Sequence, residues 1–528
     1  MGRLGRVDLL EIVLYFAVLI LIGWYFSRRS GTTEQYFLAG RNYPGWLVGI
    51  SLFGATISSI TFIAYPADAF KTGYLRYVIC ITLPIAVFIA SRFFVPFFRR
   101  GKITSVFEYL EGRFGPGTRV YGASVFILAQ CIRLAMILYL TAILMQAVTG
   151  WDARWCILLG SVVTAYYTVA GGMKAVIWTD FVQSVILTLG GLVILAAIVM
   201  KLPGGLGQIF SVAAEQGRFG LNEMGADGTL HAVPKGISLS HKTVAMLLIV
   251  GLFQWLAEYS TNQENIQKYC TSKTARDARR AMWICCWCCV PTWAYFMFLG
   301  TGLYVFYQQF PDPAALEMQT GVRKAEEILP YFIATQLPTG ITGLVVAAVL
   351  AAAMSSLSSA MNSIAAVAIT DIYRRHWVKD RSDTHYVAAA RWVTFFSAAI
   401  MVIGALWLYY SDQLTLQDLW TELQSIVAGG VLGLYMFGFF TTRGDGRAVA
   451  AGIALAVAFS AIMSFSGLGW LPQGMTQFIG AWFDGYYTGL VGNVVMFGMG
   501  FLAAGLLPKR ERDLTNLTIW TQSDTPLD

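Results

Sequence analysis

The sequence predicts an all-α membrane protein that crosses the bilayer many times. Its 528 residues are 56% hydrophobic and only 13% charged, and its mean hydropathy is +0.60. A soluble protein would carry about 25% charged residues. Apolar runs of about 20 residues recur along the chain, which is the length that an α-helix needs to span the hydrocarbon core. These observations exclude a soluble globular protein.

The apolar runs define about thirteen candidate transmembrane helices. The first run ends at Ser27, Arg28 and Arg29 without a small-residue cleavage site, so we expect it to stay as a span. The predicted spans cover residues 9–26, 43–70, 74–98, 118–148, 154–170, 175–200, 241–262, 281–307, 339–373, 387–410, 416–441, 448–465 and 485–507.

The loops between these spans alternate in charge. Lysine and arginine gather at 28–41, 99–119, 174, 268–280, 374–381, 443–447 and 509–512. The alternate loops are poor in both residues, and those at 411–418 and 466–484 contain neither. The positive-inside rule therefore places the N-terminus outside and the C-terminus inside. An odd number of spans satisfies this orientation, and the longer segments 202–240 and 308–338 become external loops.

The same charge distribution limits the partners. The net charge of +7 is explained by the basic cytoplasmic loops, so it predicts a lipid bilayer and not nucleic acid as the surrounding partner. No feature indicates an obligate protein partner. The histidines show no metal-binding spacing, and we find no hydrolase or zinc-protease motif, so the sequence does not predict an enzyme.

A serine-rich stretch lies within the span 339–373. At about 100° per residue, Ser355, Ser358 and Ser359 fall within about a third of a helical turn, with Ser356 at the edge of that arc. Hydroxyls on a face toward lipid would find no hydrogen-bond partner outside their own helix. They favour either close packing against another helix or a small cation whose water is replaced by neutral oxygens.

The span 43–70 offers a matching set of oxygens. It contains Gly54, Thr56 and Ser58 upstream of Pro66, a composition that weakens a helix. Freed carbonyls are tolerated in a membrane only where they line a cavity or bind a ligand. An unwound stretch here would form an oxygen cage suited to Na⁺, and a packed proline kink is the alternative. The candidate ligands are the carbonyls of Gly54, Ile57 and Ala352 and the hydroxyls of Ser355 and Ser356.

An acidic residue lies more than one turn inside the span 175–200. A carboxylate at this depth is unfavourable unless it is paired with a cation or faces water. A second Na⁺ held by Asp180 with Ser355, Ser358 and Ser359 would provide that cation. A proton is the other candidate, and an aspartate at a helix start in the membrane interface is the plain structural alternative.

Arg133 is the only basic residue well inside the span 118–148. Guanidinium binds a carboxylate through two hydrogen bonds and stays charged at any pH. Arg133 therefore suits an anionic substrate, and a structural pair with a nearby acid is the alternative. The polar run 262–269 is interpreted as an amphipathic helix end at the cytoplasmic side, where a gate is the less favoured interpretation.

Several of these motifs resemble the sodium:solute symporter family. The resemblance is carried, in the same order and over nearly the whole chain, by residues 103–110, 171–183, 262–269 and 353–359. It implies the leucine-transporter-like fold, in which two repeats of five spans are related by inverted topology. It also implies one general Na⁺ site at Gly54, Ile57, Ala352, Ser355 and Ser356, and a second at Asp180, Ser355, Ser358 and Ser359.

Within the family, the chain is most similar to bacterial sialic acid transporters. That similarity implies that Thr56, Ser58, Thr61 and Arg133 bind the sugar acid. Two positions depart from the expected pattern, because Cys80 replaces a glutamine and Arg76 replaces an aromatic residue. The departures leave the carboxylate clamp in place and put the rest of the pocket in question.

The expected function is a Na⁺-coupled symporter in the inner (plasma) membrane. It would import N-acetylneuraminate or a related sugar acid with one or two Na⁺ ions. The alternative is a symporter for a neutral sugar or another monocarboxylate, in which Arg133 is structural. The expected organisation is an additional N-terminal helix (1–42), a first repeat with its external loop (43–240), a second repeat (241–441), and two C-terminal helices with a short tail (442–528).

Overall fold

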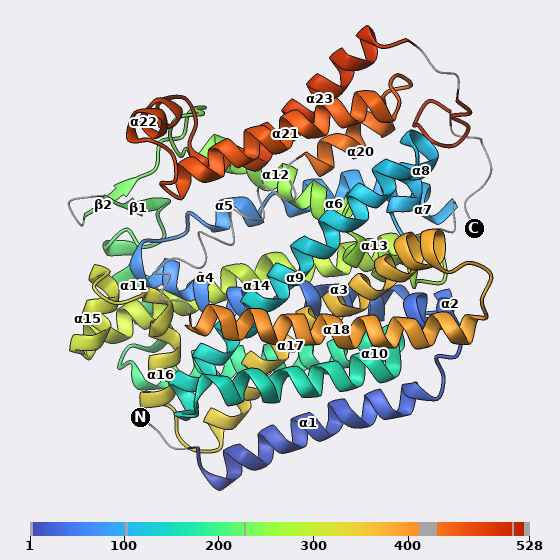
Figure 1. Cartoon of the computed structure of the whole chain (residues 1–528). Coiled ribbons are helices and arrows are strands. Elements are labelled where there is room, and N and C mark those ends of the chain that lie inside the picture. Colours follow the sequence, from blue (N-terminus) through green and yellow to red (C-terminus); the bar gives the residue numbers. More distant parts are fainter. Residues whose placement is uncertain (1–3, 101–103, 226–228, 411–429, 509–511, 522–528) are drawn as a thin grey trace.

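The computed structural model describes residues 4–100, 104–225, 229–410, 430–508 and 512–521, and most of these are helical (Figure 1). The main helices of the first half are α1 (Arg6–Ser27), α3 (Gly45–Thr56), α4 (Ser59–Lys71), α9 (Pro116–Thr149) and α10 (Ala153–Lys201). Those of the second half are α12 (Val244–Ser260), α13 (Gln263–Cys270), α14 (Ala275–Gln309), α17 (Ile341–Val367), α18 (Asp383–Tyr410), α21 (Gly446–Gly467) and α23 (Thr488–Leu506).

Shorter elements connect them. On the N-terminal side these are α2 (Thr33–Leu38), η1 (Ala39–Arg41), α5 (Tyr77–Cys80), α6 (Leu83–Ile89), η2 (Ala90–Phe94), α7 (Val95–Arg100), α8 (Phe107–Phe114) and α11 (Gly205–Glu215). A two-stranded antiparallel sheet follows, formed by β1 (Asn222–Met224) and β2 (Leu230–Ala232). Further on are α15 (Pro313–Thr320), η3 (Ala325–Glu327), α16 (Ile328–Gln336), η4 (Ala368–Trp377), α20 (Val431–Phe440), α22 (Gln473–Trp482) and η5 (Gly485–Tyr487).

The described residues contain nine helices that are long and apolar enough to cross a membrane, or up to eleven if each of two bent pairs is one span. Two of the predicted spans, 154–170 and 175–200, both lie in α10. Its 49 residues would extend over about 70 Å, more than twice the hydrocarbon core. Gly172 interrupts the helix with φ 59° and ψ −153°, so the chain bends there. The predicted span 416–441 lies largely outside the described residues.

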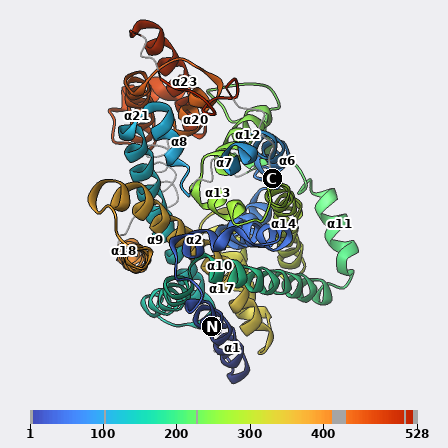
Figure 2. The ribbon, with the colours of Figure 1, turned by 90° about the vertical axis from the view of Figure 1, so that its right-hand side faces the viewer.

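The serine-bearing helix α17 is the centre of the bundle. In its most apolar stretch 89% of the residues are buried inside the protein, compared with 28% for the peripheral α1. It packs against α10, α9, α1, α18 and α3. Helix α10 can approach closely because Gly190 faces Ala348, and a Cβ on Gly190 would lie 2.3 Å from the Ala348 Cβ. In Figures 1 and 2, α20, α21 and α23 lie at the opposite edge of the bundle from α1.

Two pairs of consecutive helices are sharply bent at a short break. Helices α3 and α4 meet at an angle of 59°, and α12 and α13 at 51°. The first break lies at Ile57 and Ser58, within the stretch upstream of Pro66 that was predicted to unwind. The alternative of a kink at Pro66 does not hold, because Pro66 lies inside α4. The interpretation of 262–269 as an amphipathic helix end is wrong. All eight residues of α13 are buried, because this helix completes the second broken span.

The connecting segments separate to the two ends of the bundle. Figure 1 shows α11, the sheet, α15 and α16 at the left end, with the start of α1. Helices α2 and α8 lie at the right end. The two segments predicted to be external, 202–240 and 308–338, therefore share one end, as the alternation of charge requires. Lys268 is an exception, because it was counted with the cytoplasmic loops and lies buried in α13.

Candidate functional site

The break between α3 and α4 faces the serines of α17. The Ser355 Oγ donates a hydrogen bond to the Gly54 carbonyl at 2.8 Å, and the Ser356 Oγ donates to the Ala55 carbonyl at 2.9 Å. All four residues are buried, and Ser355 and Ser356 are 1% and 0% exposed. The Ala352 carbonyl lies 3.3 Å from the Ser355 Oγ. Oxygens of α3 and α17 therefore converge on one buried position.

These oxygens fit a small cation. A hydroxyl that donates to a carbonyl keeps lone pairs that can coordinate an ion. Ile57 ends α3 with extended backbone (φ −85°, ψ 104°), and no backbone N–H of the described residues donates to its carbonyl. The structure thus brings together Gly54, Ala352, Ser355 and Ser356 as predicted, with Ile57 at the break itself. The donor set is neutral oxygen throughout, which suits an alkali cation.

Asp180 lies beside this position on α10. It is 0% exposed and is therefore enclosed by the protein. Its Oδ2 accepts hydrogen bonds from the Ser51 Oγ at 2.6 Å and from the Lys268 Nζ at 2.7 Å. Its Oδ1 and the Ser359 Oγ are buried without a hydrogen-bond partner among the described residues. The Ser358 Oγ donates to the Ser355 carbonyl at 3.1 Å.

The sequence reasoning did not find Lys268 or Glu264 as site residues. They lie four residues apart on α13, and the same helix is anchored at its end by Arg99, which donates to the carbonyls of Cys270, Ser272 and Lys273. A signal was available in the sequence. Asp180 and Arg133 each require a counter-charge if they are buried, and the polar run 262–269 contains one residue of each sign.

Arg133 forms an ion pair with Glu264. Its Nη1 lies 2.9 Å from the Glu264 Oε2, and the side chains are 21% and 4% exposed. The Gln130 Nε2 donates to the same carboxylate oxygen at 3.0 Å. The structural pair with a nearby acid, which the sequence left open, is therefore present.

The hydroxyls predicted to accompany Arg133 lie around the α3–α4 break. The Thr56 Oγ1 donates to the Leu52 carbonyl at 2.8 Å. The Ser58 Oγ caps α4 by accepting from the Ile60 N–H, and Thr61 is buried in its first turn. No hydrogen bond between described residues joins Arg133 to these three residues. Arg133 lies on α9, Thr56 ends α3, and Ser58 and Thr61 lie at the start of α4. Helices α9 and α4 pack against each other.

Arg76 and Cys80, which replace the residues expected in the pocket, both contact α4. Arg76 forms an ion pair with Asp68 of α4, and its guanidinium lies 5.6 Å from the centre of the Tyr65 ring. The Cys80 Sγ lies 3.2 Å from the Tyr65 hydroxyl. Both substitutions therefore alter the surroundings of the second half of the broken span.

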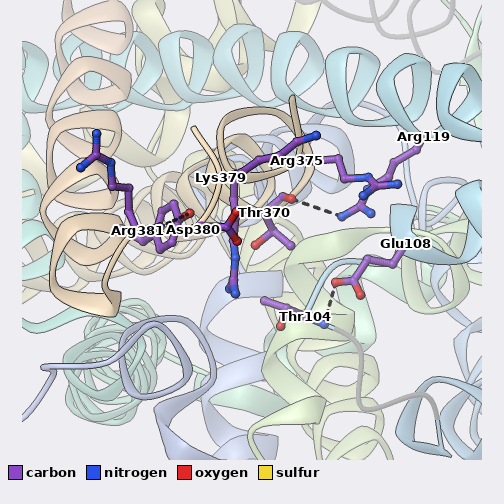
Figure 3. A pocket seen from close by; sticks show the side chains of 10 residues that line it. Thr104, Glu108, Arg119, Thr370, Arg375, Lys379, Asp380 and Arg381 are labelled. Carbon is purple, nitrogen blue, oxygen red and sulfur yellow. Dashed lines mark hydrogen bonds between the residues drawn. The ribbon is translucent and has the colours of Figure 1, made fainter. Parts of the chain in front are cut away.

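A basic cavity of about 570 Å³ lies beyond the C-terminal end of α17, between η4 and α8 (Figure 3). Arg119 pairs with Glu111 and Asp371 at 2.6 Å each, and Arg375 pairs with the same Glu111 at 2.5 Å. Burial would raise the pKa of Glu111, but its hydrogen bonds with Arg119 and Arg375 outweigh burial and lower that pKa below its ordinary value. These ion pairs join α8, α9 and η4 at this end of the bundle. The lining residues are Thr104, Glu108, Arg119, Thr370, Arg374, Arg375, Lys379, Asp380, Arg381 and Tyr386.

The broken spans and their buried oxygens define a transporter of the ion-coupled class, and comparison with known proteins gives the family. A model of the sodium:solute symporter family matches residues 36–447. The chain belongs to this family, whose coupling ion is Na⁺.

Among curated relatives, the chain is 33% identical to the sodium/sialic acid symporter SiaT of Proteus mirabilis (strain HI4320) over 447 residues. The match covers 84% of this chain and 86% of that relative. It is 30% identical to the sodium/sialic acid symporter NanT of Aliivibrio fischeri (strain ATCC 700601 / ES114), over 86% of this chain and 87% of that one.

Two solved structures resemble the fold. One is the substrate-bound outward-open state of a Na⁺-coupled sialic acid symporter, with a TM-score of 0.82 and 29% identity over 96% of this chain and 99% of that chain. The other is a nucleobase-cation-symport-1 family transporter in a closed conformation, with a TM-score of 0.52 over 92% of this chain and 98% of that chain. At 14% identity, the second likeness concerns the fold alone.

Proposed function

We propose that this protein is a Na⁺-coupled symporter that imports N-acetylneuraminate or a related sugar acid across the plasma membrane. The observation that carries the Na⁺ part is the contact of Ser355 with the Gly54 carbonyl across a helix break. The substrate part is supported by the relatives, two of which are sodium/sialic acid symporters. The solved sialic acid symporter, which matches 96% of this chain, supports both parts.

In this proposal the general Na⁺ site consists of the carbonyls of Gly54, Ile57 and Ala352 and the hydroxyls of Ser355 and Ser356. Na⁺ bound there holds α3 against α17. A second Na⁺ site consists of Asp180, Ser355, Ser358 and Ser359, and its support is the buried Asp180 with an unpartnered Oδ1. The proposed topology is thirteen spans in a five-plus-five inverted repeat, with the N-terminus outside. The broken pairs α3–α4 and α12–α13 then occupy equivalent places in the two repeats.

The proposed substrate site contains Arg133 with Thr56, Ser58 and Thr61. A sugar carboxylate would bind the Arg133 guanidinium, which already holds one carboxylate, that of Glu264. Two Na⁺ entering with one carboxylate carry one net positive charge inward. A membrane potential of 100 mV, negative inside, drives that charge with about 2.3 kcal/mol.

The ion pair with Glu264 also supports a second candidate, in which Arg133 is structural and the solute is a neutral sugar. An uptake competition assay in proteoliposomes with a Na⁺ gradient separates the two. If Arg133 clamps a carboxylate, free N-acetylneuraminate competes with labelled N-acetylneuraminate and its methyl ester does not. Equal competition by the acid and the ester, or uptake of glucose or galactose in place of the acid, would favour the neutral-sugar function.

A further inference from the structure

Lys268 is a fully buried lysine at the candidate site. Its side chain is 1% exposed, and that of Asp180 is 0% exposed. The Lys268 Nζ donates to the Asp180 Oδ2 at 2.7 Å and to the Ser51 carbonyl at 3.0 Å. The Ser51 Oγ donates to the same Oδ2 at 2.6 Å. One lysine on α13 thus joins α3 and α10.

The other half of the same carboxylate is free. The Asp180 Oδ1 is buried without a hydrogen-bond partner among the described residues, and the Ser359 Oγ is in the same condition. Buried polar atoms are rarely left unpaired in native proteins, and an unpaired oxygen of a carboxylate is the most unfavourable case. Both atoms belong to the proposed second Na⁺ site. The carboxylate therefore has a resident cation on one oxygen and vacant lone pairs on the other.

The charges near Asp180 decide what this arrangement can do. Asp180 and Lys268 together are neutral. Arg133 forms an ion pair with Glu264 and also interacts with Glu258, whose carboxylate accepts hydrogen bonds from Asn262 and Asn265. A Na⁺ on Asp180 beside Lys268 would place two cations on one carboxylate. Two cations separated by a few ångströms repel each other strongly in a medium of low dielectric constant. Each cation therefore weakens the binding of the other to this carboxylate.

We propose that Lys268 is a tethered cation that binds Asp180 in place of the second Na⁺, so that the two cations exclude each other. This inference rests on the proposed function. Na⁺ at Asp180, Ser355, Ser358 and Ser359 requires the Lys268 ammonium to leave the carboxylate. Because the ammonium also binds the Ser51 carbonyl, its departure frees α13 from α3 and α10 at this point. The second Na⁺ thereby loosens the contact between parts of the two broken spans.

The test uses the stability of the purified full-length protein in NaCl and in choline chloride. Lys268→Gln keeps a hydrogen-bond donor and removes the competing charge, whereas Lys268→Arg keeps the charge. We expect Na⁺ to raise the Tm of Lys268→Gln at a concentration at least about tenfold lower than in the wild type, since a ligand that binds only the folded state stabilises it. The Na⁺ dependence of uptake should also become steeper. Lys268→Arg and the exposed control Lys273→Gln should behave as the wild type does.

The double variant Asp180→Asn/Lys268→Gln removes both charges and keeps the buried site neutral. It should fold and lack the gain in Na⁺ sensitivity, and retention of that gain would place the second Na⁺ elsewhere and overturn the inference. If Lys268→Gln unfolds in choline chloride, NaCl should restore its folding, and failure of both salts overturns the inference as well.

An unchanged Na⁺ dependence in Lys268→Gln, beside a Na⁺-dependent wild type, refutes the tethered cation and leaves the symporter intact. A wild type whose Tm and uptake are both indifferent to Na⁺ refutes the proposed function itself.

Discussion

At the scale of single residues, Ser355 and Ser356 connect two helices in two ways. Their hydroxyls donate to carbonyls of Gly54 and Ala55 across the interface. A hydroxyl can donate one hydrogen bond and still accept or coordinate with its lone pairs. The same side chains can therefore satisfy the α3 carbonyls without an ion and complete a Na⁺ shell with one. Removing one of these hydroxyls should therefore lower the affinity for Na⁺.

Ser355→Ala should raise the Na⁺ concentration for half-maximal uptake by about tenfold or more, because the loss of about 1.4 kcal/mol of binding free energy is tenfold in affinity. The matched control is Ser363→Ala on the same helix, where the hydroxyl donates to the local Ala360 carbonyl at 2.8 Å. The control should keep the wild-type Na⁺ dependence in proteoliposomes. Equal shifts in both variants would mean that Ser355 acts through packing.

Arg133 requires a design that separates binding from folding. Removing one member of a buried ion pair leaves the other charge unpaired, typically at about 3–5 kcal/mol. The double variant Arg133→Gln/Glu264→Gln removes both members of the pair, and Glu258, which also interacts with Arg133, keeps its hydrogen bonds from Asn262 and Asn265. This variant should stay folded, as size-exclusion chromatography and Tm would show. It should nevertheless lose uptake of N-acetylneuraminate. Near-normal uptake by the folded double variant would show that Arg133 is structural.

The residues that sequence analysis found and those that it missed differ in a physical way. Ser355, Ser356 and Gly54 could be predicted because hydroxyls and a helix-weakening glycine are conspicuous within apolar spans. Lys268 and Glu264 could not be placed, because a polar run at the end of a span has the same composition as an exposed loop. Only their buried partners, Asp180 and Arg133, distinguish the two situations.

At the scale of elements, the breaks and bends determine where the site lies. The α3–α4 break supplies the carbonyls, and α13 supplies the counter-charges. The bend in α10 at Gly172 turns the chain so that the second half of this helix, which carries Asp180, runs beside α17. A Cβ at Gly172 would lie 2.7 Å from the Tyr36 carbonyl oxygen. Its φ of 59° with ψ of −153° belongs to a region that is essentially restricted to glycine.

Gly172→Ala should therefore lower the stability of the protein by about 1–3 kcal/mol, measured as a lower Tm in detergent. Gly207→Ala in α11 is the control, because a Cβ there meets nothing within 4 Å. Alanine should leave α11 unchanged or slightly more stable, since glycine is a poor helix former. An unchanged Tm in Gly172→Ala would show that the bend tolerates a side chain.

At the scale of the whole molecule, hydropathy and charge predicted the apolar helices and the separation of the loops to two ends better than they predicted how the helices pack. The alternation of basic loops matches the separation of α11, α15 and α16 from α2 and α8 at opposite ends of the bundle (Figure 1). The sequence separated the two spans of α10, 154–170 and 175–200, and the bend at Gly172 lies between them. The division into repeats at 43–240 and 241–441, with additional segments at 1–42 and 442–528, stays a prediction. Both repeats lie within the range 36–447 that the family model matches.

The central claim is that a Na⁺ gradient drives solute import by this chain. The most direct measurement is uptake of labelled N-acetylneuraminate into proteoliposomes that contain the purified full-length protein. The account predicts accumulation above the external concentration when Na⁺ is directed inward, with a further increase when the interior is made negative. It also predicts loss of accumulation when K⁺ or choline replaces Na⁺. Equal uptake in Na⁺, K⁺ and choline would contradict the account.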